Sequence, residues 1–149
     1  MSLANQSLAE ALKRAGYSVT TVRQIVFDLL LEQEPQSMNE LLGRAKNKID
    51  RASLYRTINL FERIGIVQKV YIGWKYRVEL TDEFSHHHHH LSCLKCGQII
   101  PVHSNHEIEK FVSRVGERYG FQPKRHQFEV YGICARCQNI SARPALLTG

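Results

Sequence analysis

Two Cys-x-x-Cys pairs constrain this chain more than any other feature. Cys93 and Cys96 form the first pair, Cys134 and Cys137 form the second, and the chain has no other cysteine. Four thiolates at this spacing are a complete ligand set for a tetrahedral structural zinc ion. A redox pair, two disulfides or buried thiols are the alternatives, but a redox site needs one pair and disulfides are typical of secreted chains. We therefore expect a four-cysteine zinc site that ties together the two ends of a C-terminal domain.

Five consecutive histidines, residues 86–90, lead into the first cysteine pair. A segment that enters a Cys-rich β-ribbon is expected to be extended, and side chains on a strand alternate between two faces. His86, His88 and His90 would then point one way, with His87 and His89 pointing the other. An internal tag or a solvated loop is the alternative. Because neutral imidazole is a common metal ligand, we favour two metal sites on opposite faces.

The composition, 43% apolar and 23% charged residues, is that of a folded protein of one ordinary domain or two small ones. No run approaches the roughly 18 apolar residues of a membrane span, and no signal peptide is evident. A zinc site would also account for all four cysteines in a reducing compartment. We expect a soluble, cytoplasmic protein with no membrane partner. The formal net charge of +6 favours a polyanionic partner.

Apolar residues at helical spacing predict three short helices at the start of the chain. The first ends at Gly16, and the second begins at Thr20 or Thr21 and ends before Pro35. Residues 37–40, Ser-Met-Asn-Glu, are a capping box that starts the third helix. Together these segments predict a small helical bundle.

A fourth helix, capped by Asp50, is predicted to have two different faces. Leu54, Ile58 and Phe61 lie within about 60° of one another around the helix axis, and the opposite face is polar and cationic. This pattern is typical of a recognition helix, whose N-terminal residues reach base edges while arginine and tyrosine reach phosphates. A merely solvated face is the alternative. The candidate DNA contacts on this helix are Arg51, Ser53, Tyr55, Arg56 and Asn59.

Residues 66–72 and 74–80 predict a β-hairpin around Gly73, with Trp74 at the start of its second strand. A hairpin directly after a helix-turn-helix is the wing of a winged helix, which can touch the DNA backbone. Candidate contacts to the backbone are Lys13, Arg14, Arg23, Lys69, Lys75 and Arg77.

A polar hinge, residues 81–85, separates a DNA-binding domain at 1–80 from a metal-binding domain at 86–149. In the second domain, residues 91–93 are expected to pair with 98–102 across the zinc knuckle. Asn105 is expected to cap an apolar-striped helix that Gly120 closes, and residues 126–133 to form a last strand. The tail from residue 139 onwards is expected to be loosely held.

The predicted fold class is therefore α+β, an N-terminal winged helix-turn-helix followed by a small α/β dimerisation domain with a structural zinc held by four cysteines. An exposed ribbon edge invites pairing with a second copy. We expect a homodimer that presents two recognition helices to two half-sites of double-stranded DNA.

The order of these features resembles the ferric uptake regulator (Fur) superfamily of bacterial metal-responsive repressors. The motifs that carry the resemblance are ALKRAG, TTVRQIVFDLL, SLYRTINLFERIGIV, HHHHHLSCLKCG and YGICARC. The resemblance implies metal-promoted binding of a palindromic operator by a dimer, and repression of metal-homeostasis genes. It also implies that the four cysteines hold structural zinc.

The resemblance further implies two regulatory metal sites. The site within the dimerisation domain corresponds to His87, His89, Glu109 and His126, and relatives often have aspartate at one of the first two positions. The hinge site, which usually senses the metal, corresponds to Glu79, His88 and His90. Its first family histidine falls in Pro35-Gln36-Ser37, however, and its last acidic ligand falls on Pro101. His103, two residues further on the same predicted strand face, is the candidate replacement.

The regulatory metal follows less directly, because nitrogen and oxygen donors accept Fe²⁺, Zn²⁺, Mn²⁺ or nickel. The chain lacks the sensing-site cysteine of zinc-sensing relatives and has Glu79 where peroxide-sensing relatives tend to have aspartate. Both differences favour iron over zinc, with manganese possible. A zinc-uptake or peroxide-sensing member of the superfamily is the alternative.

Two other classes of protein remain as alternatives. A metal-storage or chaperone protein would leave Tyr55 and Arg56 without a purpose. A zinc hydrolase would need an open coordination position beside a carboxylate base, and no His-Glu-x-x-His or nucleophile motif occurs. We therefore expect no enzymatic activity.

Overall fold

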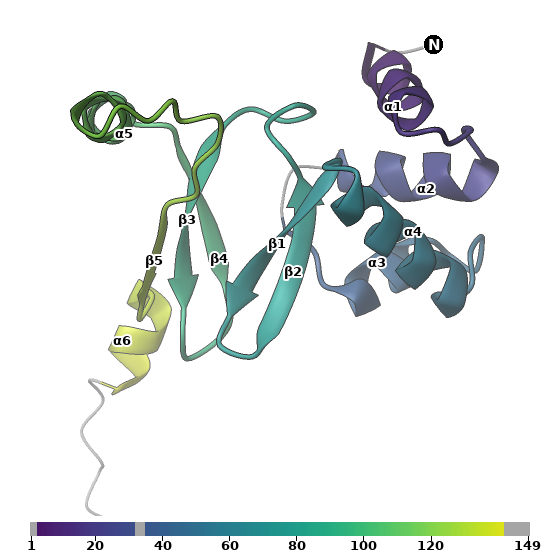
Figure 1. Cartoon of the computed structure of the whole chain (residues 1–149). Coiled ribbons are helices and arrows are strands. Elements are labelled where there is room, and N and C mark those ends of the chain that lie inside the picture. Colours follow the sequence, from purple (N-terminus) through teal and green to yellow (C-terminus); the bar gives the residue numbers. More distant parts are fainter. Residues whose placement is uncertain (1–2, 32–34, 142–149) are drawn as a thin grey trace, which may run out of the picture. The chain divides into compact units, whose positions relative to one another are not determined.

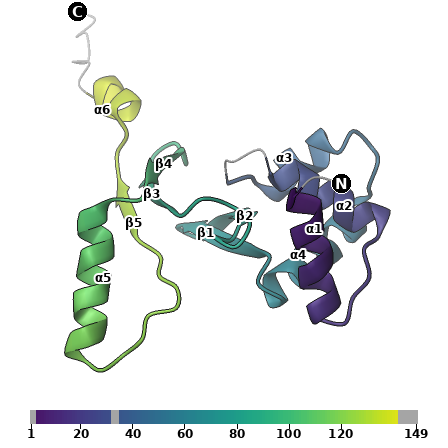
Figure 2. The same ribbon diagram turned by 90° about the horizontal axis from the view of Figure 1, so that it is seen from above.

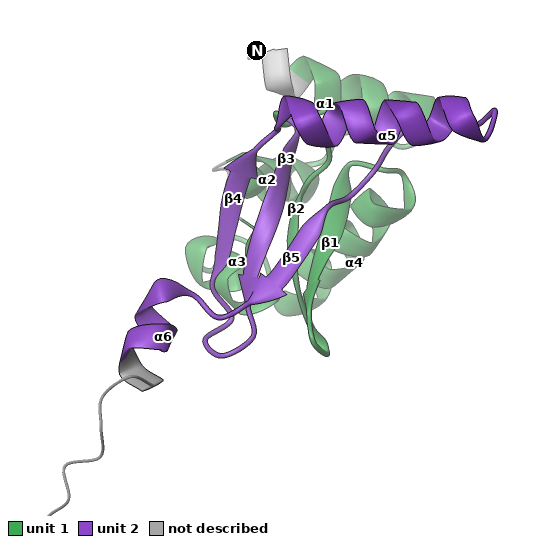
Figure 3. Cartoon of the chain, turned by 90° about the vertical axis from the view of Figure 1, so that its left-hand side faces the viewer, with its two compact units in different colours: residues 1–86 green, residues 87–149 purple. Residues whose placement is uncertain are grey.

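The computed structural model describes residues 3–31 and 35–141, and the chain forms two compact units, residues 1–86 and 87–149 (Figure 3). In the described residues, the first unit holds four helices and a two-stranded sheet, and the second holds a three-stranded sheet and two helices (Figure 1). The α+β class expected from the sequence is confirmed. No described helix is both long enough and apolar enough to cross a membrane.

The described part of the first unit has four helices, of which the last three begin where the sequence predicts capping residues. They are α1 (Leu3–Arg14), α2 (Thr21–Leu30), α3 (Met38–Arg44) and α4 (Arg51–Arg63). The Thr20 hydroxyl accepts a hydrogen bond from the N–H of Arg23 at 3.3 Å, and the Asp50 carboxylate accepts one from Ser53 at 2.8 Å. The predicted capping box at Ser37 is also present. These bonds satisfy N–H groups that the first turn of a helix leaves without a partner.

One hydrophobic core holds the first unit together. Leu54, Ile58 and Phe61 on the inner face of α4 are at most 1% exposed, while Arg56 and Asn59 on its outer face are exposed. Each large apolar side chain buried in this way contributes roughly 1.5–3 kcal/mol. Other fully buried members of the core are Leu8, Leu12, Val26, Phe27, Leu41 and Ile66. The two-faced α4 predicted from the sequence is therefore confirmed, and its cationic face is free of core packing.

The predicted hairpin consists of β1 (Val67–Ile72) and β2 (Lys75–Leu80), paired antiparallel. Gly73 has φ +60°, a conformation that glycine adopts without strain. Trp74 was expected to begin the second strand, but it lies in the turn and is 87% exposed. Gln36 forms an isolated bridge with Val78, through hydrogen bonds of 2.9 and 2.8 Å, that the sequence did not predict. This bridge ties the segment before α3 to the wing.

The sheet of the second unit has the strand order β4-β3-β5. Its elements are β3 (His88–Cys93), β4 (Ile99–His103), α5 (His106–Arg118), β5 (Glu129–Gly132) and α6 (Ala135–Ser141). Strands β3 and β4 are antiparallel, as predicted, while β3 and β5 are parallel. A parallel pair needs a long crossover, and α5 together with the return segment, residues 121–128, supplies it (Figure 2).

Two predictions for the end of the chain are wrong. The last strand covers 129–132 instead of 126–133, because residues 121–128 form a return segment before the chain reaches the sheet. Residues 139–141, assigned to a loose tail, belong to helix α6. The remainder of that tail, 142–149, lies outside the described residues.

Helix α5 has the predicted cap and stripe but does not bury the stripe within its own unit. Asn105 accepts a hydrogen bond from the N–H of Glu107 at 2.9 Å. Phe111, Val115 and Tyr119 are 60%, 41% and 73% exposed, respectively. An apolar face that a single copy leaves in water is typical of a surface that packs against a partner.

Candidate metal centres and DNA-binding surface

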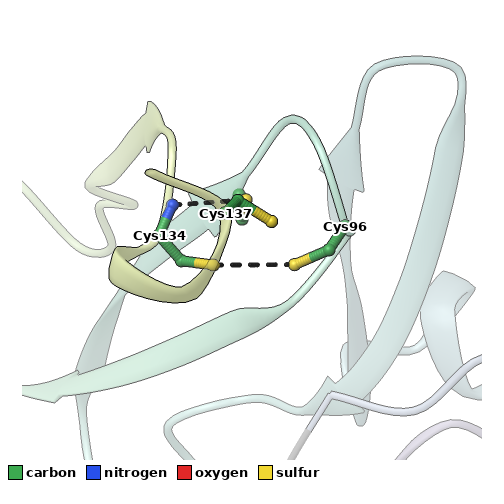
Figure 4. A group of neighbouring side chains, drawn as sticks. Cys96, Cys134 and Cys137 are labelled. Atoms are coloured by element: carbon green, nitrogen blue, oxygen red, sulfur yellow. Dashed lines mark hydrogen bonds between the residues drawn. The ribbon is translucent and has the colours of Figure 1, made fainter. Parts of the chain in front are cut away.

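The four cysteines come together at one end of the second unit. Cys93 ends β3, Cys96 follows in the turn, and Cys134 and Cys137 lie immediately before and within α6. All four sulfur atoms lie within 4.8 Å of one another, and none is in a disulfide. Figure 4 shows the sulfur atoms of Cys96, Cys134 and Cys137 directed toward a common centre. The short, unpredicted α6 is what carries the second pair to this point.

The spacing of the sulfur atoms matches a zinc tetrahedron. Zinc–sulfur bonds of about 2.3 Å in tetrahedral geometry place neighbouring sulfur atoms about 3.8 Å apart. The Cys96 and Cys134 sulfur atoms are 3.7 Å apart. A disulfide, with sulfur atoms about 2.05 Å apart, does not fit this distance. The donor set and its geometry therefore fit a structural zinc ion.

The protein alone stabilises part of the negative charge that such a site carries. The backbone N–H of Cys134, 3.3 Å from the Cys93 sulfur, and that of Cys96 lower the pKa of Cys93 to about 6. Burial, with the neighbouring thiols, raises the pKa of Cys137 to about 12. Four thiolates in one place therefore need a cation between them. Arg136 on α6 also lies beside Cys96, and this contact raises the pKa of Arg136. Arg136 could not be predicted as a neighbour of the site, because the sequence pattern did not indicate α6.

A second cluster joins His87, His89, Glu109 and His126, whose ligand atoms also lie within 4.8 Å of one another. Glu109 is in the first turn of α5, and His126 is in the return segment, not on the last strand as predicted. The Nε2 atoms of His87 and His126 are 3.1 Å apart. Oε1 of Glu109 is 3.2, 3.3 and 3.5 Å from Nε2 of His87, His89 and His126, respectively.

These distances are close to the edges of a metal tetrahedron. Metal–ligand bonds of about 2.0–2.1 Å in tetrahedral geometry place neighbouring nitrogen and oxygen ligands about 3.3–3.4 Å apart. Burial, followed by the neighbouring His87, lowers the pKa of His89, so its imidazole is kept in the neutral form that binds metals. Nδ1 of His89 is buried without a hydrogen-bond partner, which leaves Nε2 as the nitrogen directed into the cluster. The four side chains fit a divalent metal ion.

The other face of β3 carries His88 and His90, whose rings are 4.8 Å apart and edge to face. The alternation predicted for the histidine run is therefore present from His87 to His90. His103 on β4 is exposed, and among the described residues of the second unit it belongs to neither close-set ligand group.

Two residues of the first unit bear on the predicted hinge site. Glu79 on β2 is 4% exposed and accepts a hydrogen bond from Gln68 at 2.7 Å. Gln36 occupies the segment where the resemblance expects a histidine. Its amide donates to the carbonyl of Leu29 at 2.9 Å and accepts from Arg44, so it serves the packing of this unit.

The candidate DNA contacts are all in the first unit. Lys13, Arg51, Arg56, Asn59 and Lys75 are exposed. Ser53 donates to Asp50 at 2.7 Å and accepts from Arg56 at 3.2 Å, and Tyr55 packs half-buried against the core. Arg14 pairs with Glu83 at 2.5 Å, and Arg23 lies 5.4 Å from the Tyr17 ring.

Two of the basic wing residues have carboxylate partners inside the first unit. Lys69 pairs with Glu62 at 2.7 Å and Arg77 with Glu40 at 2.6 Å. Lys75, at the hairpin turn, instead lies over the exposed ring of Trp74, 4.9 Å from its centre. Lys75 is thus exposed at the wing, as are Lys13, Arg14 and the cationic face of α4 elsewhere in the first unit.

Comparisons with known proteins agree with this architecture. The model of the "Ferric uptake regulator family" matches residues 14–131. The chain is 36% identical over 132 residues to the ferric uptake regulation protein of Vibrio anguillarum, covering 85% of this chain and 87% of that protein. Among solved structures, it resembles the ferric uptake regulator of Vibrio cholerae (33% identity, TM-score 0.67, 85% of this chain and 99% of that one). It also resembles a zinc-bound manganese uptake regulator (32% identity, TM-score 0.61, 86% and 98%). The chain belongs to the ferric uptake regulator family of metal-responsive transcriptional regulators, which are not enzymes.

Proposed function

We propose that this protein is a metal-dependent repressor that binds a palindromic DNA operator as a homodimer and controls metal-homeostasis genes. One observation carries the proposal. The ligand atoms of His87, His89, Glu109 and His126 are spaced as the edges of a metal tetrahedron, in a chain that also has an exposed cationic helix at the start of a winged hairpin. A metal-storage protein has no use for the second feature.

In this proposal the two clusters of the second unit have different tasks. The set of four cysteines holds a structural zinc ion, which links β3 to α6 and so fixes the ends of the second unit. The set of three histidines and one glutamate holds an exchangeable divalent ion, because its nitrogen and oxygen donors bind such metals less selectively than thiolates bind zinc. Supporting this, β3, α5 and the return segment each supply a ligand, so metal binding stabilises their packing.

The switch is proposed to use Glu79 of the first unit together with His88 and His90 of the second. A metal held by both units binds one arrangement of them better than others, and this difference in affinity is what shifts a conformational population. When the first units of the two copies in a dimer are fixed in this way, their recognition helices meet the two half-sites of the operator in register. The residues that each unit offers suit a metal ion, since Glu79 on β2 is a carboxylate and the imidazoles of His88 and His90 are neighbours on one face of β3.

Iron is the proposed regulatory metal. Two histidines and one carboxylate are the donor set of non-haem ferrous sites. All four cysteines lie in the zinc cluster, so the chain offers no other thiol to a zinc-sensing site. Zinc and manganese are the alternatives, since one of the similar solved structures is that of a zinc-bound manganese uptake regulator.

The test compares operator binding by Glu79→Ala and His88→Ala/His90→Ala with that of the unaltered protein, each with and without Fe²⁺ under anaerobic conditions. The variants are expected to fold, keep their zinc, and lose the part of the DNA affinity that depends on metal. His106→Ala removes an exposed histidine outside the proposed sites and is expected to behave as the unaltered protein. Full metal-dependent affinity in correctly folded Glu79→Ala and His88→Ala/His90→Ala would exclude this switch.

A further inference from the structure

The two faces of β3 differ in what surrounds the histidines. On one face, Glu109 and His126 complete a set with His87 and His89. On the opposite face, His88 and His90 have neighbouring rings, and β3 is hydrogen-bonded to β4 on one side and to β5 on the other (Figure 1). The metal-binding capacity of this second face within the unit therefore depends on the residues that β4 and β5 place next to it. On β5 the residue beside His90 is Glu129, whose carboxylate accepts a hydrogen bond from the Tyr131 hydroxyl.

The register of β4 gives this face one further ligand. His103 lies directly opposite His88, and Pro101 lies directly opposite His90. Residues directly opposite in an antiparallel pair project from the same face, with Cβ atoms about 4.5–5.5 Å apart. His103 therefore shares a face with the two histidines, whereas the ring of Pro101 offers no ligand atom. Because His103 is exposed, its imidazole can turn toward them without displacing buried side chains.

We propose that His103 is a metal ligand and that it acts with His88 and His90 as a three-imidazole set for a divalent transition metal. This rests on the regulatory metal site of the proposed function and deepens it by naming the ligand that β4 supplies. Imidazole suits zinc, iron, nickel and copper, while carboxylate and water suit manganese. A site to which β4 contributes imidazole therefore discriminates against Mn²⁺.

The test measures metal binding to the full-length protein, with its structural zinc, in a Glu109→Ala/His126→Ala background that disables the other nitrogen–oxygen site. Co²⁺ is the probe, because its visible absorption reports the number and geometry of ligands. His103→Ala is expected to weaken Co²⁺ binding by at least about tenfold and to alter the absorption, since a lost ligand does more than a lost outer-shell contact. His106→Ala, at the exposed start of α5, is the matched control and is expected to change neither.

A compensating variant tests the metal preference. Pro101→Glu in the His103→Ala protein places a carboxylate directly opposite His90. It is expected to restore Co²⁺ binding and to raise the affinity for Mn²⁺ relative to Co²⁺, compared with the protein that has His103.

The outcomes separate this inference from the proposed function. Unchanged Co²⁺ affinity and absorption in His103→Ala would overturn the role of His103. If His88→Ala/His90→Ala removes Co²⁺ binding while His103→Ala does not, the regulatory site stands without His103. If the Glu109→Ala/His126→Ala background binds no Co²⁺ at all, the regulatory site and the role of His103 both fail.

Discussion

At the scale of single residues, Glu40 shows how a carboxylate can link a helix start to the wing. It accepts hydrogen bonds from the backbone of Ser37 at 2.7 Å and from Arg77 at 2.6 Å. Partial burial acts to raise the pKa of Glu40, but the hydrogen bonds from Ser37 and the charge of Arg77 outweigh it, so the pKa is lowered from 4.5. A lowered carboxylate pKa contributes stability that is present above the unfolded value and is lost as the pH falls through the folded value.

The Glu40→Gln variant should therefore unfold at a lower temperature than the unaltered protein at pH 7. The difference in thermal midpoint is expected to shrink as the pH falls below 4.5, because the unaltered side chain then becomes neutral as well. Circular dichroism at a series of pH values measures this, with Glu10→Gln on the exposed side of α1 as the control. A difference that stays constant from neutral to acid pH would show that the charge of Glu40 contributes nothing.

Cys96 is the most accessible test of the structural zinc site, because it is exposed and lies in a turn. Cys96→Ser is expected to lose its zinc on dialysis against EDTA and to lose the cooperative unfolding of the second unit, since zinc binding in small domains is worth on the order of 10 kcal/mol. Zinc analysis and calorimetry measure both effects. Lys95→Ser, the exposed neighbour, should keep its zinc. Cys96→Ser protein that retains zinc through EDTA would contradict a site built from four cysteines.

How far a site residue could be predicted depends on whether the signal for it is local in the sequence. The cysteine pairs and alternating histidines were predictable, because ligand spacing and strand alternation are local properties. The hydrogen bonds of the Gln36 amide with Leu29 and Arg44 were not predictable, because these partners come from other elements. The sequence itself shows that proline stands at position 101, where the resemblance expects an acidic ligand. The pairing of His103 with His88, in contrast, depends on the register of β3 and β4, which the sequence does not give.

At the scale of elements, α4 is the part of the molecule that is expected to meet DNA. Its inner face is fixed by Leu54, Ile58 and Phe61, so substitutions on the outer face should leave the fold intact. Arg56→Ala is expected to weaken DNA binding and to reduce the slope of log affinity against log salt by about one, as the loss of a phosphate contact does. Fluorescence anisotropy at several salt concentrations measures the slope. The matched control is Arg118→Ala, an exposed arginine of the second unit, and an unchanged slope in Arg56→Ala would remove this residue from the interface.

The elements of the first unit were predictable because each carries its own start and stop signals. Thr20, Ser37 and Asp50 cap their helices as expected. The second unit was harder, for a physical reason. Strand β5 is short and pairs with β3 only after a crossover, and α6 spans Ala135–Ser141 around a metal-directed cysteine, so neither has a long apolar period. The positions of β5 and α6 in the fold are therefore determined by the metal-ligand cluster and not by a local pattern of apolar residues.

At the scale of the whole molecule, the exposed stripe on α5 points to a second copy. Phe111 and Val115 stand on the predicted apolar stripe of α5, yet they are 60% and 41% exposed. Phe111→Ser/Val115→Ser is therefore expected to sediment as a monomer. It is also expected to lose operator affinity, because a monomer brings only one recognition helix to one half-site. Val19→Ser removes an exposed apolar residue of the first unit and is expected to remain dimeric. A Phe111→Ser/Val115→Ser protein that remains a dimer would assign the interface elsewhere.

Metal binding by this protein is proposed to control its binding to DNA. The most direct measurement is the affinity of the unaltered protein, with its structural zinc but stripped of exchangeable metal, for a fragment of a promoter upstream of a metal-homeostasis gene. Fe²⁺, Zn²⁺ and Mn²⁺ are titrated separately, with iron under anaerobic conditions. We predict that Fe²⁺ raises the affinity about 5–150-fold, the usual range of coupling between two binding sites. Equal affinity with and without every metal would contradict control by metal and would indicate a constitutive DNA-binding protein.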